Sequence, residues 1–142
     1  MIPGLYLDPR VPQPYLVVAV SIPDLSWDYA LLPFVIDTGA ARSCIHAGDA
    51  IDQFRVSPQS LDPRNWTRSI VIGGVGGRSR AHELQAEFYF RHDDGRIESV
   101  SDRILVGDIT TRGLPSLLGM DILQKFDLRV NPNIIALQRV AI

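Results

Sequence analysis

The chain is poor in cysteine and has no long apolar run. Its one cysteine, Cys44, cannot form an internal disulfide, and its setting in Arg-Ser-Cys-Ile-His favours a buried apolar residue over the alternative of a catalytic thiol. The apolar runs are too short to span a membrane, and the start of the chain lacks the basic and long apolar regions of a secretory signal. We therefore expect a cytoplasmic protein with no membrane partner.

An excess of positive charge is also missing. The chain has 14 Lys and Arg against 16 Asp and Glu, for a formal net charge of -2, and its basic residues are scattered. A nucleic-acid surface needs clustered basic residues that neutralise phosphates, so we expect no nucleic-acid partner. The residues His46, His82 and His92 lack the spacing of metal ligands, and the second histidine of a zincin motif would fall at Ala86. We expect no metal and no cofactor.

A strand that ends in a carboxylate is the most informative feature of the sequence. Residues 32–36 are apolar and rich in β-branched side chains, which predicts a strand buried on both faces, and Asp37-Thr38-Gly39 follows directly. An ionised carboxylate beside an apolar wall is unfavourable unless hydrogen bonds, water or a second, proton-sharing carboxylate compensates it. Catalysis would explain this placement, and an ordinary Asp-x-Gly turn is the structural alternative.

A glycine-rich stretch is the second informative feature. Residues 69–72 favour a strand, and four glycines then surround Val75 in residues 73–77. Glycine permits tight turns and close approach of the backbone to a ligand. The stretch is not a phosphate-binding loop, because no Lys-Ser or Lys-Thr follows its last glycine. It is either a plain hairpin tip or a hairpin that covers a ligand.

Most of the remaining pattern predicts strands within one domain, residues 1–142. Prolines in residues 1–13 favour an edge strand or an extended arm, with a frayed terminus as the alternative. Residues 55–68 read as a surface loop. Hairpins are expected at 15–36, 83–106 and 127–140, and short helices at 47–54 and after Gly119, where the apolar residues Leu118, Ile122, Leu123 and Phe126 form a buried stripe.

Two of these segments resemble motifs of the retropepsin-like aspartic proteases. Residues 35–40, apolar-apolar-Asp-Thr-Gly-Ala, resemble the catalytic signature, and residues 117–123, Leu-Leu-Gly-Met-Asp-Ile-Leu, resemble the segment after the second ψ-shaped loop. The likeness is greatest to cellular and bacterial single-domain forms of the DNA-damage-inducible type. It implies an all-β fold: a retropepsin-like closed β-barrel or sandwich with ψ-loops, a β-hairpin flap and one short C-terminal α-helix.

The resemblance also implies a half-enzyme that hydrolyses peptide or protein substrates as a homodimer. Only one Asp in the chain precedes Thr-Gly or Ser-Gly, so each copy would supply one catalytic carboxylate. Asp37 would activate a bridging water, Thr38 would link the two catalytic loops, and Gly39 would allow close backbone approach. The residues that the resemblance places against substrate are Val35, Ala40, Ala41, Gly74, Val75, Gly76, Gly77 and Leu117.

One departure from the viral pattern leaves alternatives open. Viral members carry an Asp at Ala41 and an Arg at Met120, which form an ion pair that helps to hold the substrate backbone. An apolar contact between Ala41 and Met120 would replace this pair structurally, since apolar packing can match a buried ion pair. The chain could therefore be a catalytically silent dimerisation or peptide-binding module, or a monomeric β-domain without a site. In a protease dimer, residues 2–7 and 134–142 would interleave with those of the partner.

Overall fold

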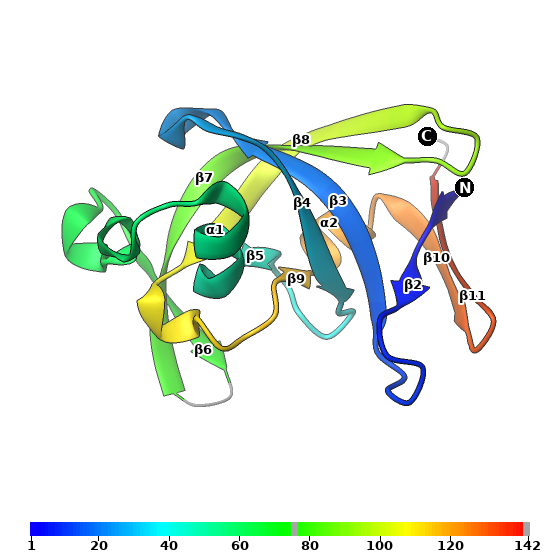
Figure 1. Ribbon diagram of the computed structural model, residues 1–142, viewed down its shortest axis with the longest axis horizontal. Coiled ribbons are helices and arrows are strands. Elements are labelled where there is room, and N and C mark those ends of the chain that lie inside the picture. Colours follow the sequence, from blue (N-terminus) through cyan, green and yellow to red (C-terminus); the bar gives the residue numbers. More distant parts are fainter. Residues whose placement is uncertain (75–76, 141–142) are drawn as a thin grey trace.

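Two β-sheets make up most of the protein, as seen in a computed structural model that describes residues 1–74 and 77–140 (Figure 1). The larger sheet has the strand order β2-β3-β4-β9-β5-β8-β7-β6, and the smaller sheet has the order β1-β11-β10. The structure is therefore mostly β, as the sequence predicts. The strands are β1 Ile2–Pro3, β2 Leu5–Tyr6, β3 Pro14–Ile22, β4 Trp27–Ile36, β5 Cys44–Ile45, β6 Ile70–Gly74, β7 Gly77–Arg91, β8 Ile97–Gly107, β9 Leu117–Leu118, β10 Phe126–Asn131 and β11 Ile134–Arg139.

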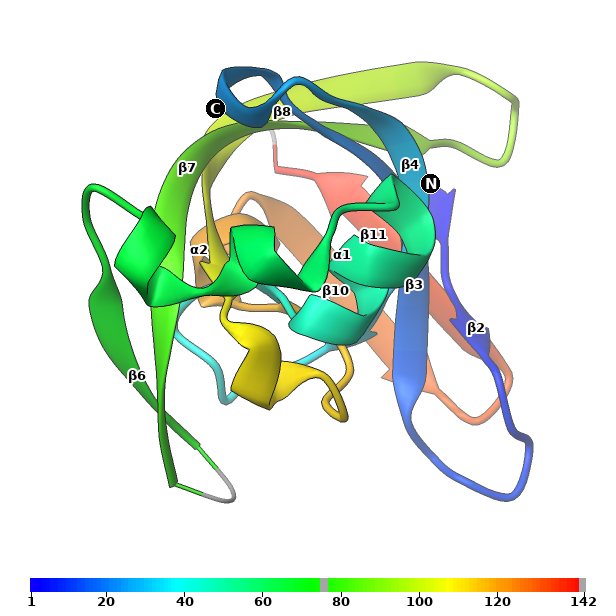
Figure 2. The same ribbon diagram turned by 60° about the vertical axis from the view of Figure 1, so that its left-hand side comes forward.

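Helices are few and short across the described ranges. The α-helices are α1 (Ala47–Phe54), where the sequence predicts it, and α2 (Met120–Leu123), the short helix expected after Gly119. The predicted surface loop 55–68 contains two 3₁₀ turns, η2 (Pro58–Leu61) and η3 (Pro63–Asn65), which lie between the end of α1 and the start of β6 in Figure 2. Further 3₁₀ turns are η1 (Pro23–Leu25) and η4 (Ile109–Thr111). None of the described helices is long and apolar enough to cross a membrane.

The core follows from the alternation of side chains along the strands. Every second residue of a strand points to the same face, so an alternating apolar pattern buries one face of the sheet. Strand β3 buries Leu16, Val18 and Val20 in this way, and α2 and β11 add further apolar side chains. All four residues of the predicted stripe 118–126 are buried. The central core side chains include Leu16, Val18, Val20, Phe34, Leu84, Phe88, Phe90, Ile104, Leu118, Ile122, Leu123, Phe126 and Leu137.

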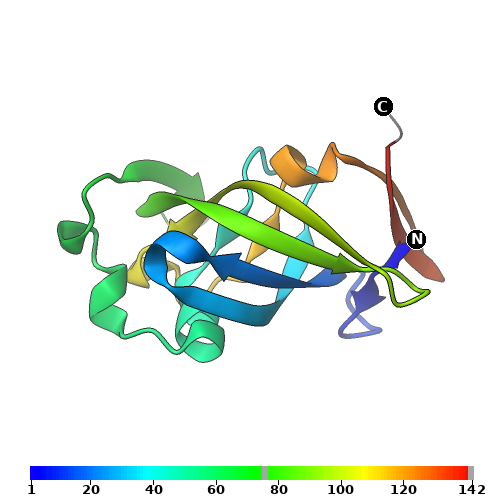
Figure 3. The ribbon, with the colours of Figure 1, turned by 90° about the horizontal axis from the view of Figure 1, so that it is seen from above.

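The predicted hairpins are confirmed. Strands β3 and β4 pair from Tyr15↔Val35 onward, β7 and β8 pair along residues 81–91 and 97–107, and β10 pairs with β11. The turn between β7 and β8 uses Gly95 at φ +89°, a conformation that glycine adopts without strain. Strand β3 also pairs with β7, so the two long hairpins lie side by side, as Figure 3 shows from above.

Three short or parallel pairings bring distant segments together at the end of β4. Strand β9 lies parallel to β4, with Val35 opposite Leu117, and antiparallel to β5. Strand β5 in turn runs parallel to β8. The residues that follow β4, β5 and β9 therefore meet in one place. This convergence positions Asp37, the first residue after β4.

The N-terminal arm pairs within its own chain. Strand β1 pairs with β11, with Ile2 opposite Leu137, and the Gly4 amide donates to the Ile135 carbonyl oxygen (2.8 Å). Ile2 is only 1% exposed, so this terminus is packed and not frayed. Strand β11 thus has neighbours on both sides, β1 and β10. Interleaving with a partner stays a prediction, and this pairing leaves only the outer edges of β1 and β10 for it.

Packing of the N-terminal arm can be tested by truncating its buried side chain. The Ile2→Ala variant should lower the free energy of unfolding by about 2–4 kcal/mol, because it leaves a cavity beside β11. The matched variant Leu7→Ala, at a side chain that is 54% exposed, should change it by less than about 0.5 kcal/mol. Urea denaturation measures both. Equal effects of the two substitutions would contradict the packing of the arm.

Candidate active site

Asp37 lies in a surface loop at the end of a buried strand. Val35 and Ile36 are each 5% exposed, whereas Asp37 is half-buried and Thr38 and Gly39 are exposed. The Asp37 amide donates to the Leu118 carbonyl oxygen (3.0 Å), and the Gly39 amide donates to Asp37 Oδ1 (2.9 Å). The backbone therefore holds this carboxylate in one orientation at the protein surface.

The segment that follows β9 holds the loop from the other side. The amide of Met120 donates to the carbonyl oxygen of Ala40 (2.8 Å), and the amide of Asp121 donates to that of Ala41 (3.2 Å). A Cβ atom on Gly119 would lie 2.8 Å from both the Ala40 and the Arg42 carbonyl oxygens. Glycine is therefore required here by a close approach of two backbones.

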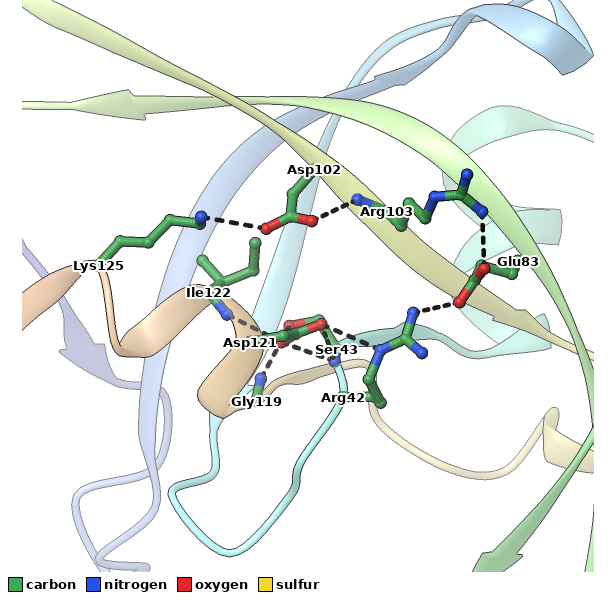
Figure 4. Close-up of polar contacts among 9 residues, drawn as sticks. All are labelled: Arg42, Ser43, Glu83, Asp102, Arg103, Gly119, Asp121, Ile122 and Lys125. Atoms are coloured by element: carbon green, nitrogen blue, oxygen red, sulfur yellow. Dashed lines mark hydrogen bonds and ion pairs between the residues drawn. The ribbon is translucent and has the colours of Figure 1, made fainter.

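A buried hydrogen-bond cluster joins Asp121 to Ser43 (Figure 4). The Ser43 amide donates to both oxygens of the Asp121 carboxylate (3.0 Å each), and the Ser43 hydroxyl donates to Oδ1 (2.7 Å). The Gly119 amide donates to the Ser43 hydroxyl oxygen (2.9 Å). Because Ser43 is fully buried, these bonds satisfy groups that water cannot reach. They fix residues 42–43 relative to residues 119–121.

An ion network extends from this cluster to strand β7. Arg42 Nη2 lies 2.7 Å from Glu83 Oε2, Arg103 Nη1 lies 2.8 Å from Glu83 Oε1, and Arg42 Nε lies 3.5 Å from Asp121 Oδ2 (Figure 4). The Arg42 guanidinium, with Arg103, holds the pKa of the Glu83 carboxyl below its ordinary value. The network connects the loop after Asp37 to the strand that forms one side of the β6–β7 hairpin.

The structure brings some of the predicted substrate residues together near Asp37. Val35 is buried opposite the half-buried Leu117, and Ala40 is half-buried in the Asp37 loop. Gly74 and Gly77 pair at the end of hairpin β6–β7. The other two predicted residues of this hairpin, Val75 and Gly76, lie outside the described residues.

The apolar contact expected between Ala41 and Met120 is not a buried one. Ala41 is exposed and Met120 is 39% exposed. The two segments are instead joined through the backbone and through Asp121. Main-chain hydrogen bonds and the Asp121 carboxylate therefore hold the two segments together, in place of the predicted apolar contact.

Cys44 is buried, and two of the histidines, His46 and His92, have hydrogen-bond partners within the protein. Burial raises the pKa of the Cys44 thiol to about 12, so the thiolate that a nucleophile needs is scarce at neutral pH. His46 Nδ1 lies 2.5 Å from the Pro115 carbonyl oxygen, and His92 Nε2 lies 2.9 Å from Glu98 Oε1. Cys44 is therefore the buried apolar residue that the sequence predicts.

Sequence reasoning missed four residues of this site: Arg42, Ser43, Glu83 and Asp121. Asp121 lies inside the recognised segment 117–123, but its partner Ser43 is 78 residues away. Glu83 is separated from Arg42 by 41 residues. The available signal was a pair of polar residues directly after the Asp-Thr-Gly loop, at the point where an apolar strand begins.

Comparisons with known proteins find similarity to solved structures. No protein-family model matches the chain, and no curated protein matches it. Among solved structures, the chain is similar to a retropepsin-like aspartic protease from Rickettsia conorii, with 18% identity, 85% of this chain and 88% of that chain covered, and a TM-score of 0.48. A likeness of this size carries no argument about function, which has to rest on the residues around Asp37.

The close approach at Gly119 predicts a strong effect of one added methyl group. Gly119→Ala should lower the free energy of unfolding by about 1–3 kcal/mol, because its Cβ meets backbone oxygens that cannot move aside. Gly113→Ala is the matched control, since a Cβ there meets nothing within 4 Å. Thermal or urea unfolding compares the two. A Gly119→Ala protein as stable as the control would contradict the close approach.

The ion network predicts a pH-dependent contribution from Glu83. Its pKa is lower in the folded protein than the ordinary 4.5, so its ion pairs stabilise the fold above that pH and are lost as the pH falls through the lowered value. Glu83→Gln should therefore be less stable than the wild type at neutral pH, and the difference should shrink in acid. Asp52→Asn, at an exposed residue of α1, controls for the loss of one negative charge. Urea titrations across pH test this, and a difference that grows in acid would contradict it.

Proposed function

We propose that this protein is a cytoplasmic homodimeric aspartic endopeptidase, in which each copy supplies one Asp37. One observation carries the proposal: a half-buried carboxylate ends a buried strand, held by the Gly39 amide, in a loop whose tip is exposed. The loop that carries this carboxylate is held by backbone bonds to residues 118–121 and by the buried Ser43–Asp121 cluster, which a structural turn does not need. A catalytic group does, because a small displacement lowers the rate.

A retropepsin-like fold for the single domain is part of this proposal. The β3–β7 pairing supports a barrel that closes, because it joins strands far apart in the order of the sheet. The insertion of β9 between β4 and β5 supports a ψ-loop. Hairpin β6–β7 would be the flap, and α2 the C-terminal helix.

A second copy is required because one carboxylate cannot perform this chemistry. Two carboxylates held close together share a proton, since two like charges at that distance do not both ionise. The chain has one Asp-Thr-Gly sequence, so the second Asp37 would come from a partner across a two-fold axis. The exposed Thr38 and Gly39 would meet their counterparts there.

Because the two carboxylates share one proton, one acts as a base and the other as an acid. The ionised Asp37 takes a proton from a water molecule as the water oxygen attacks the carbon of the peptide bond. The protonated Asp37 gives its proton to the carbonyl oxygen, which forms a neutral tetrahedral intermediate. Proton transfer to the nitrogen then breaks the C–N bond and releases an amine and a carboxylic acid. The Gly39 amide keeps Asp37 oriented throughout.

The surroundings of Asp37 favour a peptide with apolar side chains. Val35 and Leu117, which are opposite each other on neighbouring strands, would form an apolar wall beside the carboxylate, and Ala40 would add a small side chain. The flap, with Gly74, Val75, Gly76 and Gly77, would close over the bound peptide and exclude water. The exposed Ala41 offers no acceptor for a substrate amide beyond its backbone, which favours binding through apolar contacts.

A silent peptide-binding dimer is the second candidate. The observation that favours it is the pair Ala41 and Met120, where neither exposed side chain offers the charge found in viral enzymes. Both candidates bind a peptidic transition-state mimic, but only the enzyme cleaves a peptide. Cleavage of a denatured protein mixture, followed by mass spectrometry from acidic to neutral pH, separates the two.

Catalysis by Asp37 predicts a severe loss in one variant. Asp37→Asn should lower peptide hydrolysis by at least about 100-fold, because the amide can neither take nor give the shared proton. Asp52→Asn should keep wild-type activity, and both variants should sediment as dimers. Activity that persists in Asp37→Asn would overturn the assignment.

A mixing experiment tests whether the two carboxylates act together. When wild type and Asp37→Asn exchange subunits at equal concentration, about one quarter of the dimers keep both carboxylates, so activity per wild-type chain should halve. Independent sites would leave the activity per wild-type chain unchanged. Unchanged activity per wild-type chain would contradict proton sharing between the two Asp37 carboxylates, but not a catalytic role for Asp37.

A further inference from the structure

Two adjoining cavities lie beside strands β7 and β8, and Asp37 lines neither of them. The outer cavity, of about 420 Å³, is lined from η1, from residues 67–70 and from strands β7 and β8. The inner cavity, of about 360 Å³, is lined from η1, from Trp27 at the start of β4, from the segment 60–66 and from the same two long strands. Leu25 and His82 line both, so the cavities are neighbours. Their volumes fall within the roughly 300–1,000 Å³ of small-molecule sites.

The inner cavity is walled by aromatic and aliphatic side chains. Trp66 stacks on His82, with ring centroids 5.2 Å apart and an interplanar angle of 25°, and its Nε1 donates to the Ser60 carbonyl oxygen (2.9 Å). Burial lowers the pKa of His82, so its ring is an uncharged wall at neutral pH. Trp27, Leu61 and Val106 complete the apolar lining. Such a wall suits an aromatic group, which gains from stacking as well as from burial.

Two exposed side chains of opposite charge, Asp24 and Arg68, line the outer cavity. Of its four charged residues, Glu83 and Arg103 bind each other, and Glu83 also binds Arg42. Within residues 1–74 and 77–140, no ion pair involves Asp24 or Arg68. The two residues come from different elements, η1 and the segment before β6, and both line the same cavity. A ligand with one positive and one negative group complements this arrangement.

We propose that these cavities bind a free aromatic amino acid, with its ammonium group at Asp24, its carboxylate at Arg68 and its side chain between Trp66 and the apolar lining. The site is independent of Asp37 and of the proposed peptidase reaction. Arg68 suits the carboxylate because a guanidinium can donate two parallel hydrogen bonds to it. The inner cavity supplies preference for a large side chain, and the outer cavity supplies preference for a zwitterion.

Tryptophan fluorescence can report binding at this site. Its two tryptophans are Trp27 and Trp66, and both line the inner cavity. Selective tryptophan excitation therefore follows this site, and L-phenylalanine is a probe that does not fluoresce under it. L-phenylalanine should produce a saturable change in emission. N-acetyl-phenylalanine, which lacks the positive charge, and phenylalaninamide, which lacks the negative charge, should each bind at least about tenfold more weakly.

Paired variants assign each charge to its partner. Arg68→Gln should weaken phenylalanine at least about tenfold and leave phenylalaninamide unchanged, because the amide has no carboxylate to lose. Asp24→Asn should weaken phenylalanine similarly and leave N-acetyl-phenylalanine unchanged. The controls are Arg64→Gln and Asp28→Asn, which remove the same charges from nearby positions that line neither cavity. Both should bind phenylalanine as the wild type does.

Three outcomes would overturn the proposal. The first is the absence of a saturable emission change in the folded wild type. The second is equal affinity for the three phenylalanine compounds, which would mean contact with the ring alone. The third is equal weakening by the control variants. None of these results bears on Asp37, and a protein without peptidase activity would still bind phenylalanine if the proposal holds.

Discussion

The close contact between residues 37–43 and residues 117–121 is the constraint on which the rest of this structure depends. It exists because Gly119 has no side chain, so its backbone can lie against the carbonyl groups of Ala40 and Arg42. Three backbone hydrogen bonds and the buried Ser43–Asp121 cluster then join the two segments. The orientation of Asp37 follows from this contact and from the end of β4, and neither would be sufficient alone.

This contact also explains how the protein tolerates a carboxylate so near its core. The carboxylate of Asp121 is largely buried, but it accepts bonds from the Ser43 amide and hydroxyl and lies near Arg42. A buried charge with this many partners is stable where an unpaired one would not be. Asp37, by contrast, has its backbone partners on one side and solvent on the other. The first carboxylate is structural, and the second is the one that we propose as catalytic.

The ion network around Glu83 adds a link between the candidate active site and the sheet. Arg42 belongs to the Asp37 loop, Glu83 to β7 and Arg103 to β8, so a single carboxylate joins three elements (Figure 4). Glu83 and Arg103 also line the outer cavity. The ion network therefore extends from the Asp37 loop to one wall of the outer cavity.

Strand positions, the hairpins and the buried stripe around Ile122 followed from the sequence alone, because they depend on local periodicity and on side-chain size. The tertiary structure decided the partners of Asp121 and Glu83, the internal pairing of β1 with β11 and the exposure of Ala41 and Met120. Each of these involves residues that are far apart in the chain or packing on a shared surface. Periodicity records which face a side chain occupies, but not which distant residue meets it there, and only the folded chain determines that.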